Sequence, residues 1–239
     1  MLEDTCAGLA IPDVVGKDTL RRAVRAFNRF EQRKQSSRRY GGKAANLGAG
    51  IGVPHWAARY ELGNSPEAWQ RYLDAVPAWD RQRRQVLAPS LGCDPLEMLV
   101  GIVEAAWQRP LQRARHPRFG RLMGAGLVRT GAAKPHFDNA AFDVPMEIVG
   151  HIGAVLVLDG RSDAVQRVYR MRLTDPIEAA GNYDIPVPAD TPYVDLPSPP
   201  GTVSFLPATW IHAVHDGPQR LTVALHLAVT RSGTVYYYS

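Results

Sequence analysis

The feature that most constrains the fold is a change near residue 121, after which short apolar segments alternate with turn-forming residues. Clusters of Gly, Pro, Asn and Asp separate these segments, and no helix-length apolar pattern lies between them. Parallel strands would need a crossover, usually a helix, between one strand and the next. The second half of the chain therefore predicts an antiparallel barrel or sandwich. The candidate strands are residues 122–130, 147–158, 165–173, 202–206 and 221–230.

The residues before this point carry helix signals instead. Asp18 is a candidate N-cap for an amphipathic helix, because an apolar stripe at helical spacing follows it. Ser65 followed by Pro66 predicts the start of a second helix, which we expect Pro77 to interrupt. Asp94 opens a third helix with the spacing of a capping box. The sequence thus indicates an α+β chain.

Repeated glycine marks residues 40–52, between the first two expected helices. A dinucleotide-binding fingerprint would need glycine at position 53 and a strand before the first glycine. The chain has Val53 there and a basic segment in place of the strand. Because glycine leaves the backbone unrestrained, we expect a flexible loop or lid rather than a cofactor-binding turn.

Length and composition fit one globular domain of 239 residues, 45% of them hydrophobic and 21% charged. We expect the helices and lid loop of residues 1–118 to share one domain with a core of residues 119–239. Cys6 and Cys93 stand alone, so we expect neither a disulfide framework nor a zinc finger. No apolar run approaches the length of a membrane span, and the acidic start does not resemble a signal peptide. We therefore expect no membrane partner and a cytoplasmic location.

The net charge of +5 and the pI of about 9.4 raise the question of a nucleic-acid partner. Nine Lys or Arg residues lie between Arg21 and Lys43, where Glu31 is the single acid. The same stretch carries the apolar stripe of the first helix, so these charges are expected on its solvated face. No recognised nucleic-acid-binding motif accompanies them, and nucleic acid is not the expected partner. A charged lid over an anionic substrate remains an alternative.

The motif that carries chemistry is His136-Phe137-Asp138. Side chains two apart on a strand point to the same face, so His136 and Asp138 can both reach one ion. A second imidazole from a distant strand would complete two histidines and one carboxylate, a set that leaves three coordination positions open on iron(II). His212 is the preferred second imidazole, and His215 is the alternative. His55 and His116 are expected to be structural.

Residues 206–214, followed by Arg220-Leu221-Thr222, resemble the closing strands of the Fe(II)/2-oxoglutarate-dependent oxygenases. In that superfamily an HxD motif is followed at a distance by a histidine, and then by a basic residue with Ser or Thr two positions on. Here His136 and His212 are 76 residues apart, and His212 and Arg220 are 8 apart. The resemblance covers roughly residues 121–230. It implies a double-stranded β-helix, a jelly-roll or cupin-like barrel, with the N-terminal helices packed outside it.

The resemblance also implies a role for each motif residue. His136, Asp138 and His212 would bind iron(II), and Arg220 and Thr222 would hold the distal carboxylate of 2-oxoglutarate. A guanidinium and a hydroxyl two residues apart on a strand face the same cavity, which agrees with that role.

Four further residues are expected around the same cavity. His226 shares the strand parity of Arg220 and Thr222, and His151 is expected to point inward as well. Arg129 and Asn139 flank the HxD motif in the sequence. They are the candidate substrate-binding residues.

The implied activity is the O2-dependent hydroxylation of a small polar metabolite, an amino acid or a derivative. Related halogenases carry Gly or Ala in place of the metal-binding carboxylate. This chain keeps Asp138, which favours hydroxylation, or another oxidation such as desaturation, over halogenation. Two alternatives are a protein- or nucleic-acid-modifying dioxygenase that docks through the basic helix, and a cupin-like metal-binding protein without oxygenase activity.

Overall fold

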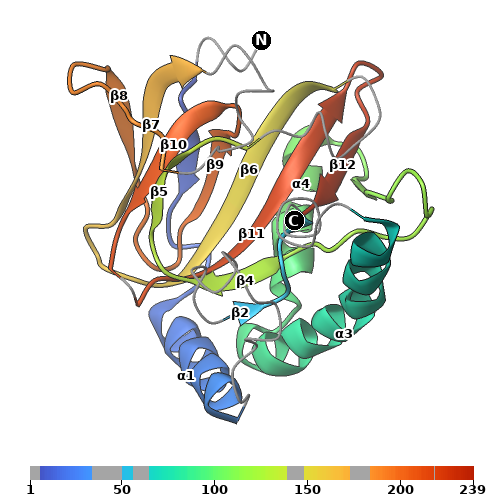
Figure 1. Cartoon of the computed structure of the whole chain (residues 1–239). Coiled ribbons are helices and arrows are strands. Elements are labelled where there is room, and N and C mark those ends of the chain that lie inside the picture. Colours follow the sequence, from blue (N-terminus) through green and yellow to red (C-terminus); the bar gives the residue numbers. More distant parts are fainter. Residues whose placement is uncertain (1–5, 34–49, 56–64, 139–147, 173–183, 218) are drawn as a thin grey trace.

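The computed structural model describes residues 6–33, 50–55, 65–138, 148–172, 184–217 and 219–239. Within these residues the chain forms two β-sheets and three helices (Figure 1). All five predicted strand segments contain a strand, and the three predicted helices are present.

The larger sheet holds most of the long strands and is antiparallel except where β12 meets β3. Its central strands, β6 and β11, pair over almost their whole length (Figure 1). Its order is β1 (Leu9–Ile11), β9 (Val203–Pro207), β6 (Ile148–Asp159), β11 (Leu221–Thr230), β12 (Val235–Tyr238) and β3 (Gln112–Arg113), while β4 (Leu127–Thr130) pairs with β11 and with β2 (Gly50–Ile51).

The smaller sheet is antiparallel throughout and faces the larger one. Leu206 of β9 packs with Val168, Leu196 and Trp210 of the smaller sheet, so apolar side chains meet between the sheets. This arrangement agrees with the predicted antiparallel sandwich or barrel, although none of the described strands pairs with both sheets. The order is β5 (Ala133–His136), β10 (Trp210–His215), β7 (Val165–Arg172) and β8 (Tyr193–Pro197).

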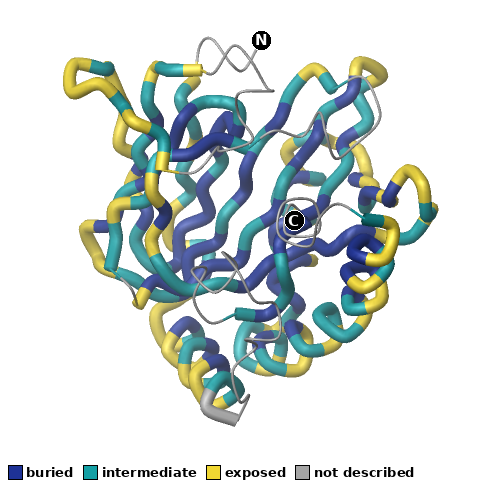
Figure 2. Tube along the Cα trace, in the orientation of Figure 1, coloured by how far each residue is buried: buried dark blue, intermediate teal, exposed yellow. Residues whose placement is uncertain are grey.

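Strand β11 shows how the sequence separates a core face from a site face. Leu221, Val223 and Leu225 belong to the main apolar core, which includes side chains from all three helices. Burial of each such leucine or valine contributes about 1.5–3 kcal/mol. Alternation directs Thr222 and His226 to the opposite side, into the space between the sheets. Figure 2 shows the buried central strands and the exposed outer faces of the helices.

Helix α1 (Lys17–Arg33) begins earlier than the sequence predicted. The carbonyl of Gly16 accepts the first helical hydrogen bond, from the N–H of Leu20 at 3.0 Å. Asp18 therefore lies inside the first turn rather than at the N-cap, where it pairs with Arg21. A carboxylate in this turn still interacts favourably with the helix dipole.

Helix α3 (Pro66–Leu91) contradicts the expected interruption at Pro77, because the helix continues through this residue. Proline cannot donate a hydrogen bond to the carbonyl four residues earlier, which belongs to Leu73. The guanidinium of Arg121 donates to that carbonyl at 3.0 Å and replaces the missing bond. The predicted start is confirmed, since the Ser65 hydroxyl accepts a hydrogen bond from the N–H of Ala68.

Helix α4 (Pro95–Trp107) begins as predicted, with the Asp94 carboxylate accepting a hydrogen bond from the N–H of Leu96. The same carboxylate forms a buried two-pronged ion pair with Arg83 of α3. One side chain thus caps α4 and ties it to α3. Among the described helices none alone is long and apolar enough to cross a membrane, and only the bent α3–α4 pair passes that test on length and composition.

The first 118 residues also supply three short strands that the sequence did not predict, β1, β2 and β3. The predicted loop or lid at 40–52 is wrong at its end, because Gly50 and Ile51 form β2 and pair with β4. A Cβ on Gly50 would lie 2.3 Å from the carbonyl oxygen of Val128, so only glycine allows this close pairing. The preceding residues, 40–49, lie outside the described residues.

Candidate metal centre

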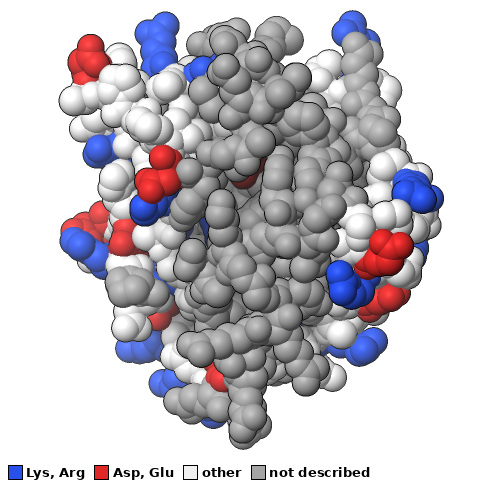
Figure 3. Space-filling model, in the orientation of Figure 1, with Lys and Arg blue, Asp and Glu red and all other residues white. Residues whose placement is uncertain are grey.

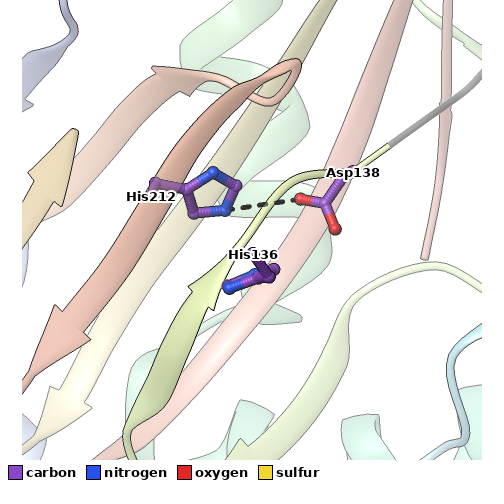
Figure 4. Close-up of side chains that lie close together, drawn as sticks. All are labelled: His136, Asp138 and His212. Atoms are coloured by element: carbon purple, nitrogen blue, oxygen red, sulfur yellow. Dashed lines mark ion pairs between the residues drawn. The ribbon is translucent and has the colours of Figure 1, made fainter. Parts of the chain in front are cut away.

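His136, Asp138 and His212 lie together between the two sheets (Figure 4). His136 ends β5 and His212 lies on β10, where the two residues are direct partners in the antiparallel register. Asp138 follows two residues after β5, and its backbone N–H donates to the carbonyl of Ala208 at 2.8 Å. One potential ligand atom from each residue lies within 4.8 Å of the others. These three residues are grouped closely enough to hold a metal ion.

Hydrogen bonds orient both imidazoles. His136 Nδ1 lies 2.7 Å from the carbonyl oxygen of Lys134, and His212 Nδ1 lies 2.9 Å from that of Trp210. A carbonyl oxygen only accepts, so each Nδ1 carries a proton, and Nε2 is the nitrogen that a neutral ring would offer to a metal. Metal-binding histidines are commonly oriented in this way. His212 Nε2 lies 3.5 Å from Asp138 Oδ2 (Figure 4).

The electrostatics of the site favour the metal-binding forms of its residues. Burial lowers the pKa of His136 to about 3, so the imidazole is neutral at neutral pH. Burial alone would raise the pKa of Asp138, but the surrounding histidines, His226 foremost, hold it below its usual value. A neutral imidazole and an ionised carboxylate are the forms that coordinate metals.

His215 is not part of this group. It is the last residue of β10, is exposed, and has opposite strand parity to His212. The geometry therefore supports His212 as the second imidazole rather than the alternative.

A cluster of four aromatic rings, His55, His151, His226 and Tyr238, adjoins the metal centre. His226 Nδ1 lies 3.9 Å from Asp138 Oδ2, and the rings of His226 and His151 are 5.2 Å apart. Strand parity predicted that His226 and His151 point inward. His55 and Tyr238 are additional, with ring centroids 5.0 Å apart. His55 was expected to be structural, and no sequence motif marks it or Tyr238.

Thr222 lies on the site side of β11, and Arg220, which directly precedes this strand, already has partners. Its guanidinium donates to Asp216 at 3.2 Å and to the Ser198 hydroxyl at 3.0 Å. Asp216 follows β10 and Ser198 follows β8, so Arg220 reaches from the larger sheet to the smaller one. Burial lowers the pKa of Arg220 to about 10, and the contact with Asp216 partly offsets this effect.

Of the two candidate substrate-binding residues, the structure describes Arg129 but not Asn139. Arg129 lies on β4 as the direct register partner of Thr222 and is partly exposed. Burial is the main cause of the lowered pKa values of His136 and Arg220, and the positive charge of Arg129 adds a smaller effect in the same direction. Asn139 lies outside the described residues.

The surface charge of the described residues is mixed on the face seen in Figure 3. Lys and Arg side chains alternate with Asp and Glu around its rim. Helix α1 carries exposed arginines, but Asp18 pairs with Arg21 on that helix. On this face the described residues form no continuous basic surface.

No family model matches the chain, and no curated protein matches it either. Among the solved structures that share its fold are two of an N-substituted L-amino acid dioxygenase from Burkholderia ambifaria AMMD. One has a TM-score of 0.57 at 12% identity, covering 99% of this chain and 88% of that one. The other, in complex with α-ketoglutarate, has a TM-score of 0.56 at 14% identity, covering 79% of this chain and 77% of that one. At these identities the likeness establishes the fold.

Proposed function

We propose that this protein is an iron(II)- and 2-oxoglutarate-dependent oxygenase that hydroxylates a C–H bond of a small polar metabolite of the amino-acid class. The observation that carries the proposal is the grouping of His136, Asp138 and His212 between the sheets. Two histidines and one carboxylate are the ligand set of non-haem iron oxygenases. The fold is shared with an enzyme described as an amino acid dioxygenase, which supports the same chemistry.

The same likeness supports a closed form of the fold. We infer that the two facing sheets are the halves of a double-stranded β-helix, with α1, α3 and α4 packed on the outside of the larger sheet. The inter-sheet hydrogen bond from Ser204 Oγ to Gln166 Oε1, at 2.8 Å, helps to hold the halves together. In this proposal residues 119–239 are the catalytic core and residues 1–118 belong to the same domain.

Iron(II), when bound, would supply the activation of O2 that is coupled to decarboxylation of 2-oxoglutarate to succinate. The protein's part is to orient the ligands. The carbonyls of Lys134 and Trp210 hold the two imidazole rings, and the bond from Asp138 N–H to Ala208 fixes the segment that carries the carboxylate. Orientation by such outer contacts typically contributes tenfold or more to metal affinity.

Thr222 and Arg220 are proposed to hold the distal carboxylate of 2-oxoglutarate. Thr222 is buried and lies on the same side of β11 as His226, which adjoins Asp138. A hydroxyl and a guanidinium can both donate to a carboxylate oxygen. The ring cluster that includes His151 and His226 is proposed to face the substrate, since it adjoins the carboxylate ligand.

The proposed substrate class is supported by the name of the solved neighbour, an N-substituted L-amino acid dioxygenase. A screen of N-substituted and free L-amino acids, with succinate measured by NMR and each product by mass spectrometry, tests the proposal. Succinate that forms only with iron(II), 2-oxoglutarate and one of these compounds, together with a product heavier by one oxygen, is the expected result. The Asp138→Ala variant is the matched inactive control. A wild-type protein that forms no succinate above that control with any member of the panel would refute the proposal.

A further inference from the structure

The position of Arg129 is fixed by two strand registers. Strand β4 pairs with β11 so that Thr222 faces Arg129 and Val223 faces Val128. Direct partners in an antiparallel pair point to the same side of the sheet. Val128 and Val223 both lie in the main apolar core, so Arg129 and Thr222 point the other way, toward the space that holds the metal centre.

The Arg129 guanidinium forms no hydrogen bond or ion pair with any described side chain. Arg220 differs in this respect, because Asp216 and Ser198 engage both of its terminal nitrogens. The Asp216 side chain is fully buried and lies against a nearly buried guanidinium, so the two charges compensate each other. Of these three charged residues, Arg129 leaves a net positive charge that an anion would neutralise.

The proposed function requires a site for a dicarboxylate whose 2-oxo acid end meets the metal. The other carboxylate must then lie a few ångströms away, on the same side of the larger sheet. Thr222 and Arg129 are adjacent there, and the N–H of Gly131 donates to the carbonyl of Arg220 at 2.9 Å, so the backbone of Arg220 lies beside the end of β4. An anion between the two guanidinium groups would relieve their repulsion.

We propose that Arg129 is a second anchor for the distal carboxylate of 2-oxoglutarate, binding it from β4 opposite Thr222, while Arg220 is held and compensated by Asp216. This inference rests on the proposed function and deepens it. It assigns Arg129 to the co-substrate, whereas the sequence had placed it against the substrate. The strand pairing is the reason, because the sequence alone could not place Arg129 beside Thr222.

The test compares two ligands that differ only at the distal carboxylate. 2-Oxoglutarate and 2-oxopentanoate share the 2-oxo acid end and the chain length, but only the first has a second carboxylate. Anaerobic calorimetric titration of each ligand into the iron(II)-loaded protein measures binding without turnover. The variants are Arg129→Met and Arg129→Lys. Arg170→Met is the matched control, since Arg170 is an exposed strand arginine on β7.

We expect Arg129→Met to weaken 2-oxoglutarate binding about 10- to 100-fold, which is the loss expected when one charge-assisted hydrogen bond is removed. Its affinity for 2-oxopentanoate should stay within about twofold of wild type, and Arg170→Met should match wild type for both ligands. Arg129→Lys should recover part of the loss, because it restores the charge without the planar fork.

Two results would overturn the inference while leaving the proposed function intact. One is an unchanged affinity of Arg129→Met for 2-oxoglutarate, and the other is an equal loss for both ligands, which would mean a structural role. If wild-type protein loaded with iron(II) binds neither 2-oxo acid, the proposed function itself fails and the inference fails with it.

Discussion

The buried ion pair of Arg220 and Asp216 allows its effect on stability to be measured separately from its effect on 2-oxoglutarate binding. Arg220 is 1% exposed, and its guanidinium lies 3.2 Å from an Asp216 carboxylate whose side chain is fully buried. Asp216 Oδ1 also accepts the backbone N–H groups of Arg161 and Gly217. The perturbation is to remove the charge of each partner alone and then of both together, using Arg220→Met and Asp216→Asn. Asparagine keeps the acceptor for the two backbone groups.

The magnitude follows from the pKa of Arg220, which burial lowers from its ordinary value to about 10 even with Asp216 beside it. At about 1.4 kcal/mol per pH unit, keeping this guanidinium charged costs the folded state about 3 kcal/mol at neutral pH. The unfolded chain binds the proton more tightly, so this cost is present below pH 10 and disappears as the pH rises through the ordinary pKa of arginine. Burial of the Arg220 charge therefore opposes folding. Removing one partner leaves the other charge buried without an opposite charge, which costs about 3–5 kcal/mol.

Urea unfolding of the metal-free protein at neutral pH, followed by circular dichroism, measures the cycle. We expect each single variant to lose about 3–5 kcal/mol and the double variant to lie within about 1 kcal/mol of wild type. 2-Oxoglutarate binding should nevertheless remain impaired in the double variant, because the guanidinium is gone. Additive losses, with the double variant less stable than either single variant, would refute the reasoning.

Three further predictions concern acid stability, β2 and the product. Burial acts to raise the pKa of Asp94, but its hydrogen bonds with Arg83 outweigh this and lower it below 3.8. Ionised Asp94 therefore contributes to the free energy of unfolding above pH 3.8, and this contribution is lost as the pH falls through the lowered pKa. Asp94→Asn should make the free energy of unfolding depend less on pH below about pH 4, as measured by acid titration. An unchanged pH dependence would contradict this. Gly50→Ala should lower the free energy of unfolding by about 1–3 kcal/mol, because the added Cβ would meet the Val128 carbonyl. The control is Gly101→Ala on α4, which has open space around it and should be neutral or stabilising. Equal effects of the two changes would argue against the β2 pairing. Mass spectrometry should find an oxidised product without halogen even in abundant chloride, since Asp138 would occupy the coordination position that a halide needs. A chlorinated product would rule out Asp138 as a ligand.

The sequence predicted the parts of the fold that local pattern determines. Strands such as β6 and β11 carry long apolar runs bounded by turn residues, and the caps Ser65 and Asp94 mark helix starts directly. The spacing of His136 and Asp138 likewise predicted that their side chains lie close together, as they do in the structure. Each of these features depends on residues close together in the chain.

The remaining features depend on distant partners, which a single sequence does not reveal. Pro77 is tolerated because Arg121, far along the chain, bonds the carbonyl that proline leaves without a donor. His55 joins the ring cluster because its backbone N–H donates to the carbonyl of Ser239, next to Tyr238. The compensation of Arg220 by Asp216 needed the three-dimensional contact as well.

Stoichiometric binding of iron(II) tests the central claim most directly. Anaerobic titration with metal analysis should find one iron(II) per chain in wild-type protein and in His215→Ala, whose side chain is exposed outside the group. His136→Ala, Asp138→Ala and His212→Ala should each lose this binding while retaining wild-type circular dichroism. If His212→Ala keeps the metal and His215→Ala loses it, or if wild-type protein binds no iron(II), the metal centre described between the two sheets is wrong.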